Sequence, residues 1–289
     1  MHSSVFGQLI KRYSHWFLML PALVLVVIIF TIPIVTLVRI SLHKSTSSGI
    51  YEVGLTVDSY MRFLASSWYR GLMWRTFRLA LAATAISIVV GYPLAYKIWR
   101  STGTQKTVLL MAVMLPLFTN LIARLYGWQL LLARNGPVNY VLVQLGLFKE
   151  AALLNYNFGA VLVGVTYVAL PYFILILMST LEGVDWSLVE AAQGLGASRV
   201  RSFIEIVFPL SIPGLVSAIA VAFSWGMGAY AEPLILGSPN EWTMGSESGK
   251  QIVSMFDWPF GAAIAFLLVI AMLLFVLAIE WMGRRWRLS

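Results

Sequence analysis

The stretch EAAQGLGASRVRSFIEIVFP, Glu190–Pro209, decides the fold class together with its flanks. It is polar and rich in glycine, whereas the runs on either side, Ala151–Leu181 and Ile206–Ala231, contain no charged residue. Each run is long enough to cross a bilayer as a helix, which takes about 20 apolar residues. We therefore expect a structured, charged segment between two membrane spans, where a soluble partner can reach it.

The composition of the whole chain is that of a membrane protein. Of its 289 residues, 60% are hydrophobic and 11% are charged, unlike the balance of soluble domains. The apolar run near the N-terminus is longer than that of a cleavable signal peptide, so we expect it to be retained. We predict an all-α integral membrane protein in which residues 1–289 form one domain. Its six transmembrane helices are predicted at Trp16–Val38, Leu79–Ile98, Val108–Leu132, Phe158–Leu181, Ile212–Leu236 and Phe260–Met282.

The net charge of +8 is attributed to membrane orientation rather than to nucleic-acid binding, because basic residues favour the cytoplasmic ends of spans. The short connection Lys97–Lys106 and the arginine-rich C-terminus weigh most under this rule. We therefore expect both termini to lie in the cytoplasm. The sequence contains no cysteine, and its three histidines all lie near the first span, which excludes thiolate sites and a histidine metal cluster elsewhere.

The polar stretch itself predicts two short helices joined by a glycine corner. Ser187 and Glu190 fit a capping box, in which a hydroxyl caps the helix start and a carboxylate three residues later returns to it. Gly194 and Gly196 are expected to break this helix, since glycine tolerates a positive φ. Ser198 is expected to cap a second helix, which carries Arg199, Arg201 and Glu205. The product would be a helix–turn–helix along the cytoplasmic surface, with Pro209 and Pro213 marking the entry to the fifth span.

Two segments outside the polar stretch also carry informative residues. Val57–Leu72 mixes aromatic and charged residues and is predicted as a helix at the outer interface. Arg124 lies inside the predicted third span, about 24 Å along a helix that begins at Val108. It is either a snorkelling anchor beside Tyr126 and Trp128 or a charge that faces a pore or pairs within the bundle.

The spacing of the polar stretch resembles the coupling loop of ABC importer permeases: E-A-A, three residues, G, nine residues, I-x-L-P. Here the matching residues are Glu190-Ala191-Ala192, Gly196 and Ile206-Val207-Phe208-Pro209, with Phe208 in place of leucine. Nearly the whole chain resembles the first-permease type of the spermidine/putrescine importer family. The strings that carry this likeness are RLYGW with NGPVN, LPYF, FPLSIPG, EPLILG and DWPFGAA.

This resemblance implies the six-helix bundle of type I importer permeases (MetI-like), with residues 182–209 as a cytoplasmic coupling loop. It implies a location in the lipid of a bacterial inner membrane, a second permease subunit that is expected to be a different chain, a cytoplasmic ATPase dimer and an external substrate-binding protein. No P-loop pattern occurs in the sequence, so ATP is expected to be used by partner subunits, with no cofactor bound by this chain. The ATPase-coupling residues implied by the motif are Glu190, Ala191, Ala192, Gly196, Arg199 and Arg201.

Residues expected along a substrate path are aromatic or charged and lie in or next to the spans. Carboxylates beside aromatic rings suit a polyammonium ligand, through charge pairing and cation–π contact. The same residue types also serve as interfacial anchors and helix caps, which is the favoured interpretation of Asp257. Tyr167 and Tyr172 could equally be packed. The full candidate set is Arg124, Tyr167, Tyr172, Trp225, Tyr230, Glu232 and Asp257.

Rival functions remain for the sequence. A membrane enzyme would need a catalytic group of side chains in the spans, and the spans contain no histidine after His43 and no acidic pair at helical spacing. An ATP-independent channel or scaffold would not need the coupling-loop spacing. Within the permease family, the cargo is expected to be a polyamine or a related small organic ion. Arg124 and the positive charge keep an anionic or zwitterionic solute, such as an opine, a phosphonate or ferric iron in complex, as the alternative.

Overall fold

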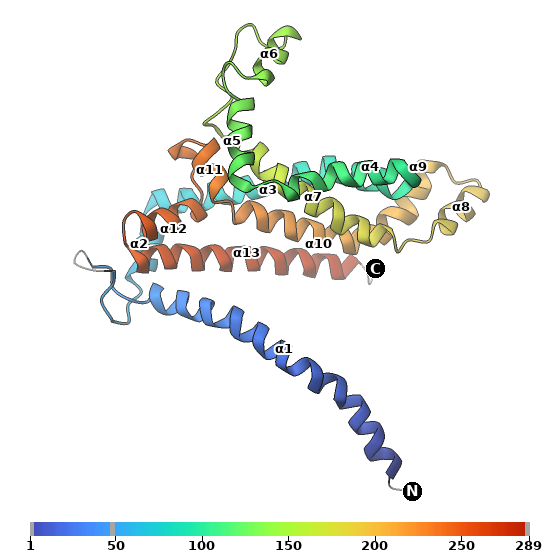
Figure 1. Ribbon diagram of the computed structural model, residues 1–289, viewed down its shortest axis with the longest axis horizontal. Coiled ribbons are helices and arrows are strands. Elements are labelled where there is room, and N and C mark those ends of the chain that lie inside the picture. Colours follow the sequence, from blue (N-terminus) through green and yellow to red (C-terminus); the bar gives the residue numbers. More distant parts are fainter. Residues whose placement is uncertain (1–2, 47–49, 287–289) are drawn as a thin grey trace.

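A computed structural model describes residues 3–46 and 50–286, and in this part of the chain nearly all regular structure is helical (Figure 1). Five helices in it are long and apolar enough to span a membrane, or six if one bent pair counts as a single span. The five long helices are α1 (Ser3–Ser41), α3 (Ser67–Arg100), α7 (Phe158–Leu181), α10 (Phe208–Met227) and α13 (Trp258–Trp286). The predicted fold class is confirmed.

Helices α3, α7 and α10 pack on one another and form the centre of the bundle, with α13 alongside α10 (Figure 1). Small residues allow this close approach, as is usual between membrane helices. A Cβ added at Gly226 of α10 would lie 2.5 Å from the Cα of Ala80 on α3. One added at Gly91 of α3 would lie 2.6 Å from the ring of Phe173 on α7. The three central helices are therefore packed with little spare space.

Helix α1 leaves the bundle and contacts it only toward its C-terminal end, beside α13 (Figure 1). The part that can span a membrane, Met19–Ser41, has a mean hydropathy of 2.8, and none of its most apolar stretch is buried within this chain. Side chains from Leu23 to Val35 are exposed on every side of the helix. Its apolar surface must therefore be covered by lipid or by another subunit.

The third predicted span is not one helix, so the prediction of a continuous helix over Val108–Leu132 is wrong. Helix α4 (Gly103–Met114) runs into the 3₁₀ turn η1 (Leu115–Phe118), and α5 (Leu121–Leu131) then starts at an angle of 103°. Pro116 has no N–H to donate to a continuing helix. The side chain of Asn120 accepts hydrogen bonds from the N–H groups of Ile122 and Ala123, which starts a new helix. Helix α6 (Pro137–Gln144) lies beyond α5, away from the bundle (Figure 1).

Two other predicted boundaries also differ. The fifth span ends at Met227 rather than Leu236, because the chain unwinds over Gly228–Tyr230 before α11 (Ala231–Leu236) begins. The interfacial helix α2 covers only Asp58–Ala65, since α3 already starts at Ser67. Helix α12 (Met244–Val253) follows the 3₁₀ turn η3 (Pro239–Glu241) and packs on α13. Together α2, α11 and α12 cover one end of the bundle, and the polar stretch lies at the other (Figure 1).

Candidate functional site

The polar stretch folds into an elbow, defined here as residues 182–207, at the end of the bundle opposite α12 (Figure 1). Its first helix, α8, covers Trp186–Gly194. The predicted capping box at Ser187 is wrong. Asp185 is the N-cap instead, and its carboxylate accepts the Ser187 N–H at 2.9 Å. This hydrogen bond holds the pKa of Asp185 below its usual value.

The corner of the elbow is at Gly196, which has a φ of +95°. This left-handed conformation suits glycine and disfavours residues with a Cβ. Gly194 is still helical, so only one of the two glycines makes the corner. The side chain of Ser198 then caps the next helix by accepting the Arg201 N–H, as predicted.

The second helix of the elbow is not a separate surface helix, as the sequence suggested. Helix α9 (Arg199–Ser202) continues through the π-helical turn η2 (Phe203–Val207) into α10, so residues from Arg199 to Met227 form one span-length element. The Phe208 N–H donates to the carbonyl of Phe203, five residues back. The second half of the elbow and the fifth span are therefore parts of one continuous helical element.

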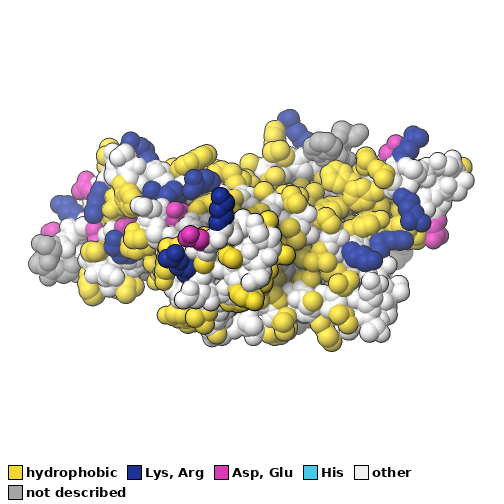
Figure 2. Space-filling view, turned by 90° about the horizontal axis from the view of Figure 1, so that it is seen from above, with side chains coloured by type: hydrophobic (Ala, Val, Ile, Leu, Met, Phe, Trp, Pro, Cys, Tyr) yellow, Lys and Arg dark blue, Asp and Glu magenta, His cyan; other side chains and the backbone are white. Residues whose placement is uncertain are grey.

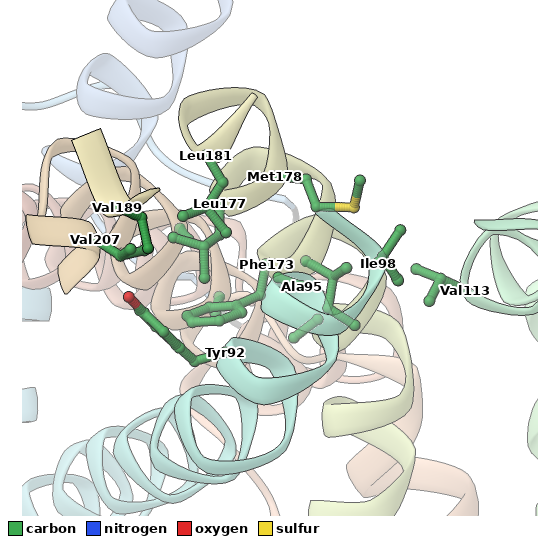
Figure 3. Close-up of a cluster of buried hydrophobic side chains, with 14 residues drawn as sticks. Tyr92, Ala95, Ile98, Val113, Phe173, Leu177, Met178, Leu181, Val189 and Val207 are labelled. Carbon is green, nitrogen blue, oxygen red and sulfur yellow. The ribbon is translucent and has the colours of Figure 1, made fainter. Parts of the chain in front are cut away.

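Apolar side chains anchor the elbow to the bundle. Val189 of α8 and Val207 of η2 are both buried in a cluster with Tyr92 of α3 and with Phe173 and Leu177 of α7 (Figure 3). Because one core cluster includes side chains of α3, α7, α8 and η2, the first helix of the elbow is packed against the same residues that hold the spans together.

The tip of the elbow is exposed. Leu195, next to the corner, is 92% exposed, and Leu188 and Val200 are also exposed. Glu190 and Ala191 are exposed, whereas Ala192 is partly covered. Arg199 is exposed without a recorded ion pair in the described chain, and Arg201 pairs with Glu205 at 2.9 Å. An apolar side chain at the tip, within a polar rim, has the composition of a docking surface for another protein.

The candidate path residues fall into separate groups. Arg124 donates to the carbonyl of Pro116 at 3.3 Å, and its guanidinium lies 5.9 Å from the ring of Tyr167. Tyr167 also packs edge-on against Trp128, with ring centroids 5.4 Å apart. Because of the break before α5, Arg124 lies in the first turn of a new helix, not deep along a continuous one. The Nε of Arg124 is buried without a hydrogen-bond partner in the described chain.

A second group joins the fourth and fifth spans. The rings of Tyr172 and Trp225 are stacked, with centroids 5.2 Å apart and an interplanar angle of 24°. Trp225 is exposed on the surface of this chain. Tyr230 is also exposed, in the unwound segment between α10 and α11. In the described part of the chain, no ring contact joins Tyr230 to the stacked pair of Tyr172 and Trp225.

The two acidic candidates differ in their surroundings. The side-chain carboxylate of Asp257 accepts three hydrogen bonds: from Arg62 Nη1 at 2.7 Å, from Ser45 Oγ at 2.6 Å and from the Phe260 N–H at 3.2 Å. It therefore works as a cap for α13 and as an ion-pair partner, which matches the favoured interpretation. Glu232 of α11 is only 7% exposed and lies against Gly164 of α7.

Comparison with known proteins decides the family. A family model described as "Binding-protein-dependent transport system inner membrane component" matches residues 1–288. The chain belongs to this family. It is an inner-membrane permease of an ABC importer, and its helices cross the membrane several times.

Curated relatives of this permease include polyamine transporters. The spermidine/putrescine transport system permease protein PotB of Escherichia coli (strain K12) is 30% identical over 261 residues, which covers 90% of this chain and 94% of the relative. The inner membrane ABC transporter permease protein YdcU of the same strain is 31% identical over 222 residues, 72% of this chain and 70% of the relative.

Solved structures share the fold of this permease. A bacterial alginate ABC transporter in complex with its pentasaccharide-bound periplasmic protein contains a chain that matches with a TM-score of 0.70 and 16% identity, over 96% of each chain. The MetNI methionine ABC transporter contains one that matches with a TM-score of 0.60 and 19% identity, over 78% of this permease and 97% of that chain. These matches agree with the predicted type I importer bundle.

The sequence interpretation missed two features of the elbow. The exposure of Leu195 could have been predicted from the sequence. A leucine between two glycines at the end of a helix has no neighbouring side chains on that helix to pack against. Lys97 and Arg100 were treated only as orientation signals, yet they line a hollow beside α8 together with Trp186 and Glu190. Nothing in the local sequence indicates that the end of α3 meets α8.

Proposed function

We propose that this permease imports a polyamine or a related small organic cation, with its elbow docked on a separate cytoplasmic ATPase dimer. The supporting observation is the elbow itself: an exposed apolar tip at Leu195, an exposed Glu190, and a corner that depends on Gly196. On this proposal residues 182–207 are the coupling element of a single-domain chain. Glu190, Ala191, Ala192, Gly196, Arg199 and Arg201 form or shape its contact surface.

The proposed mechanism moves solute without covalent chemistry in this chain. ATP binding closes the ATPase pair and pushes on the tip of the elbow. Because Val189 and Val207 are packed into the central core, the push reaches α3, α7 and α10 rather than bending a free loop. The spans then tilt, and access to the solute alternates between the two sides of the membrane.

The proposed orientation follows from the elbow. Helix α1 begins, and α13 ends, on the side of the bundle where the elbow lies (Figure 1). If the elbow meets a cytoplasmic ATPase, both ends of the chain are cytoplasmic. The opposite end, covered by α2, α11 and α12, would then face the substrate-binding protein.

We also propose a second, different permease subunit as the other half of the pathway. Helix α1 presents apolar side chains in all directions and has little support from its own bundle. The stacked Tyr172 and Trp225 are partly open on the surface of this chain, so they would face the partner or the solute between the two halves. Aromatic faces bind organic ammonium groups. We place Arg124, Tyr167, Tyr230 and Glu232 as further candidates along this path, and Asp257 as a structural support at its outer end.

The test is the Leu195→Asp variant in the assembled importer. A charge at the tip should reduce the ATPase that co-purifies with the tagged permease by roughly ten- to hundredfold, because losing an apolar anchor that is buried in the complex costs on the order of 1.5–3 kcal/mol. ATP-driven uptake of radiolabelled spermidine into vesicles should fall in parallel. Val253→Asp is the matched control, since Val253 is 68% exposed at the opposite end of the molecule.

Two results would contradict this proposal. Retention of the ATPase by Leu195→Asp at the level of Val253→Asp would remove the elbow from the docking surface. ATP-driven uptake of an anionic solute without any uptake of spermidine, in an importer that retains its ATPase, would overturn the polyamine assignment while leaving the docking assignment in place.

A further inference from the structure

A hollow of about 620 Å³ lies between the C-terminal turn of α3 and the elbow. Its floor includes the partly buried aromatic rings of Tyr96 and Phe203, which lie over the buried side chains of Val189 and Val207. Its rim carries charges from Lys97 and Arg100 of α3 and from Glu190 and Arg199 of the elbow. The hollow therefore combines an apolar base with a rim that is positive overall.

The basic groups on this rim have no ion-pair partner in the part of the chain that the structure describes. Neighbouring charges at the same end of the molecule are paired: Lys106 with Glu182 and Arg201 with Glu205, each at 2.9 Å. Figure 2 shows Lys and Arg side chains gathered at this end, next to a broad hydrophobic surface. The unpaired positive charge on the rim is thus available to an anion.

Arg100 is held in place for such a contact. Its guanidinium lies 3.4 Å from the ring centroid of Trp186, in a cation–π contact across the hollow from α3 to α8. Trp186 also packs edge-on against Trp99, with ring centroids 5.4 Å apart. Stacking occupies the face of the guanidinium and leaves its N–H edge for an oxygen ligand.

Tryptophan and basic residues at the end of a span mark the level of the lipid headgroups. We propose that this hollow binds the headgroup phosphate of an anionic phospholipid from the cytoplasmic leaflet. This inference rests on the proposed function, which places the elbow on the cytoplasmic side. Lys97 and Arg100 hold the phosphate, Arg100 is linked to the elbow by its contact with Trp186, and the aromatic floor covers the glycerol and the first carbons of the chains.

The floor distinguishes a lipid from the other anions that could visit the rim. Inorganic phosphate would bind only to the charged side chains of the rim and would leave the floor of the hollow exposed to water. An acidic segment of the ATPase would approach the exposed tip at Leu195, whereas the hollow opens beside the last turn of α3, a helix long enough to span the membrane. Basic pockets at the cytoplasmic ends of membrane helices bind lipid headgroups in this way.

A bound phosphate would join α3 to the elbow through opposite sides of the hollow. Lys97 and Arg100 belong to a central span, and Trp186, which Arg100 contacts, belongs to the first helix of the elbow. The lipid would therefore stabilise one angle between elbow and bundle. Anionic lipid is expected to raise the coupling of ATP hydrolysis to transport.

The experiment uses the whole importer in phosphatidylcholine nanodiscs with and without phosphatidylglycerol, analysed by native mass spectrometry. The Lys97→Gln/Arg100→Gln variant should retain roughly 25-fold less phosphatidylglycerol than the wild type, because each basic side chain near an anionic surface contributes roughly a fivefold gain. Arg284→Gln/Arg285→Gln is the control. It removes the same charge at the end of α13, where Arg284 pairs with Glu280 and Arg285 stacks on Trp281.

Equal retention of phosphatidylglycerol by the wild type and the α3 variant would overturn the proposal. Displacement of the lipid by millimolar inorganic phosphate would also overturn it, by identifying a soluble anion as the ligand. Loss of the ATPase from the α3 variant with lipid retention unchanged would assign the hollow to the partner instead. The proposed function has its own failing result, which is a wild-type permease that retains no ATPase. The two failures are distinguishable because bound lipid is measured on the permease itself.

Discussion

The two ends of the bundle are built by different means. At the elbow, apolar side chains such as Val189 and Val207 provide the attachment, and the polar groups point outward. At the opposite end, polar groups are buried and bonded to one another. Apolar contacts tolerate sliding, whereas a buried hydrogen bond fixes a position and is costly to break. The difference suggests one end that tilts and one end that holds its shape.

The fixed end depends on a network around the start of α12. The N–H of Met244 donates to Thr76 Oγ1 of α3 at 2.9 Å, and Thr243 Oγ1 donates to the carbonyl of Ala229 at 2.6 Å. Within α12, Gln251 Nε2 donates to Glu247 Oε1 at 2.7 Å. All of these side chains are buried. The network ties α12 to both the second span and the end of the fifth.

The largest effect, a loss of ATP-driven uptake, is expected from Gly196→Val at the elbow. A side chain in the left-handed region costs about 1–2 kcal/mol, which reduces the population of the correct corner about tenfold. ATP-driven uptake into vesicles should fall by about that factor, with normal membrane insertion. Gly194→Val is the matched control, since a Cβ at either glycine meets nothing within 4 Å and only Gly196 has a positive φ. Equal uptake by the two variants would show that the corner does not matter.

An effect on thermal stability, with a smaller effect on uptake than that of Gly196→Val, is expected from Thr76→Val at the fixed end. It leaves the buried N–H of Met244 without its acceptor, which costs about 1–3 kcal/mol. Thermal unfolding of the purified permease should therefore begin at a lower temperature, and α12 should lose protection in hydrogen exchange. The control is Thr84→Val, because Thr84 bonds only to the carbonyl of Ala80 within its own helix. If both substitutions shift unfolding equally, the link between α3 and α12 is not what holds this end.

The smallest effect concerns pH and the cap of α8. The hydrogen bond from Ser187 lowers the pKa of Asp185, so the ionised carboxylate is favoured in the folded elbow. Its contribution is present above the unfolded aspartate value of about 3.9 and is lost as the pH falls through the lower folded value. Amide exchange at Ser187 should accelerate in that acid range. Asp185→Asn keeps an acceptor but cannot titrate, so it should show no such step; a step in this variant would assign the acid response to another group.

The sequence predicted the parts of this fold that depend on local pattern. Apolar length located the spans, and the glycine and serine of the elbow predicted its corner and its second cap. It failed where two local signals competed. The apolar run over Val108–Leu132 led to the prediction of one continuous helix. Pro116 and Asn120 within it are the residues that stop one helix and start the next. Asp185 and Ser187 both suit an N-cap, and only the backbone geometry chooses Asp185.

The features that depend on tertiary contact could not be predicted. The string MGSESGKQIV forms α12 and buries Ser246, Glu247 and Gln251, which bond to one another or to the cap residue Thr243, while Thr76 of α3 accepts the Met244 N–H. The hollow beside α8 likewise exists only because the end of α3 reaches the elbow. The sequence does not indicate which charged residues on separate helices will lie close together in the fold.

The wide turn η2 changes how the faces of this helix should be counted. A π turn contains one residue more than an α turn, and each residue of an α-helix advances about 100° around the axis. A helical wheel drawn back from Met227 is therefore correct only as far as Val207. Beyond it, Arg199 and Arg201 are rotated by one position relative to the span, so pairs designed across this turn, such as crosslinks or engineered cysteines, need their positions shifted by one residue.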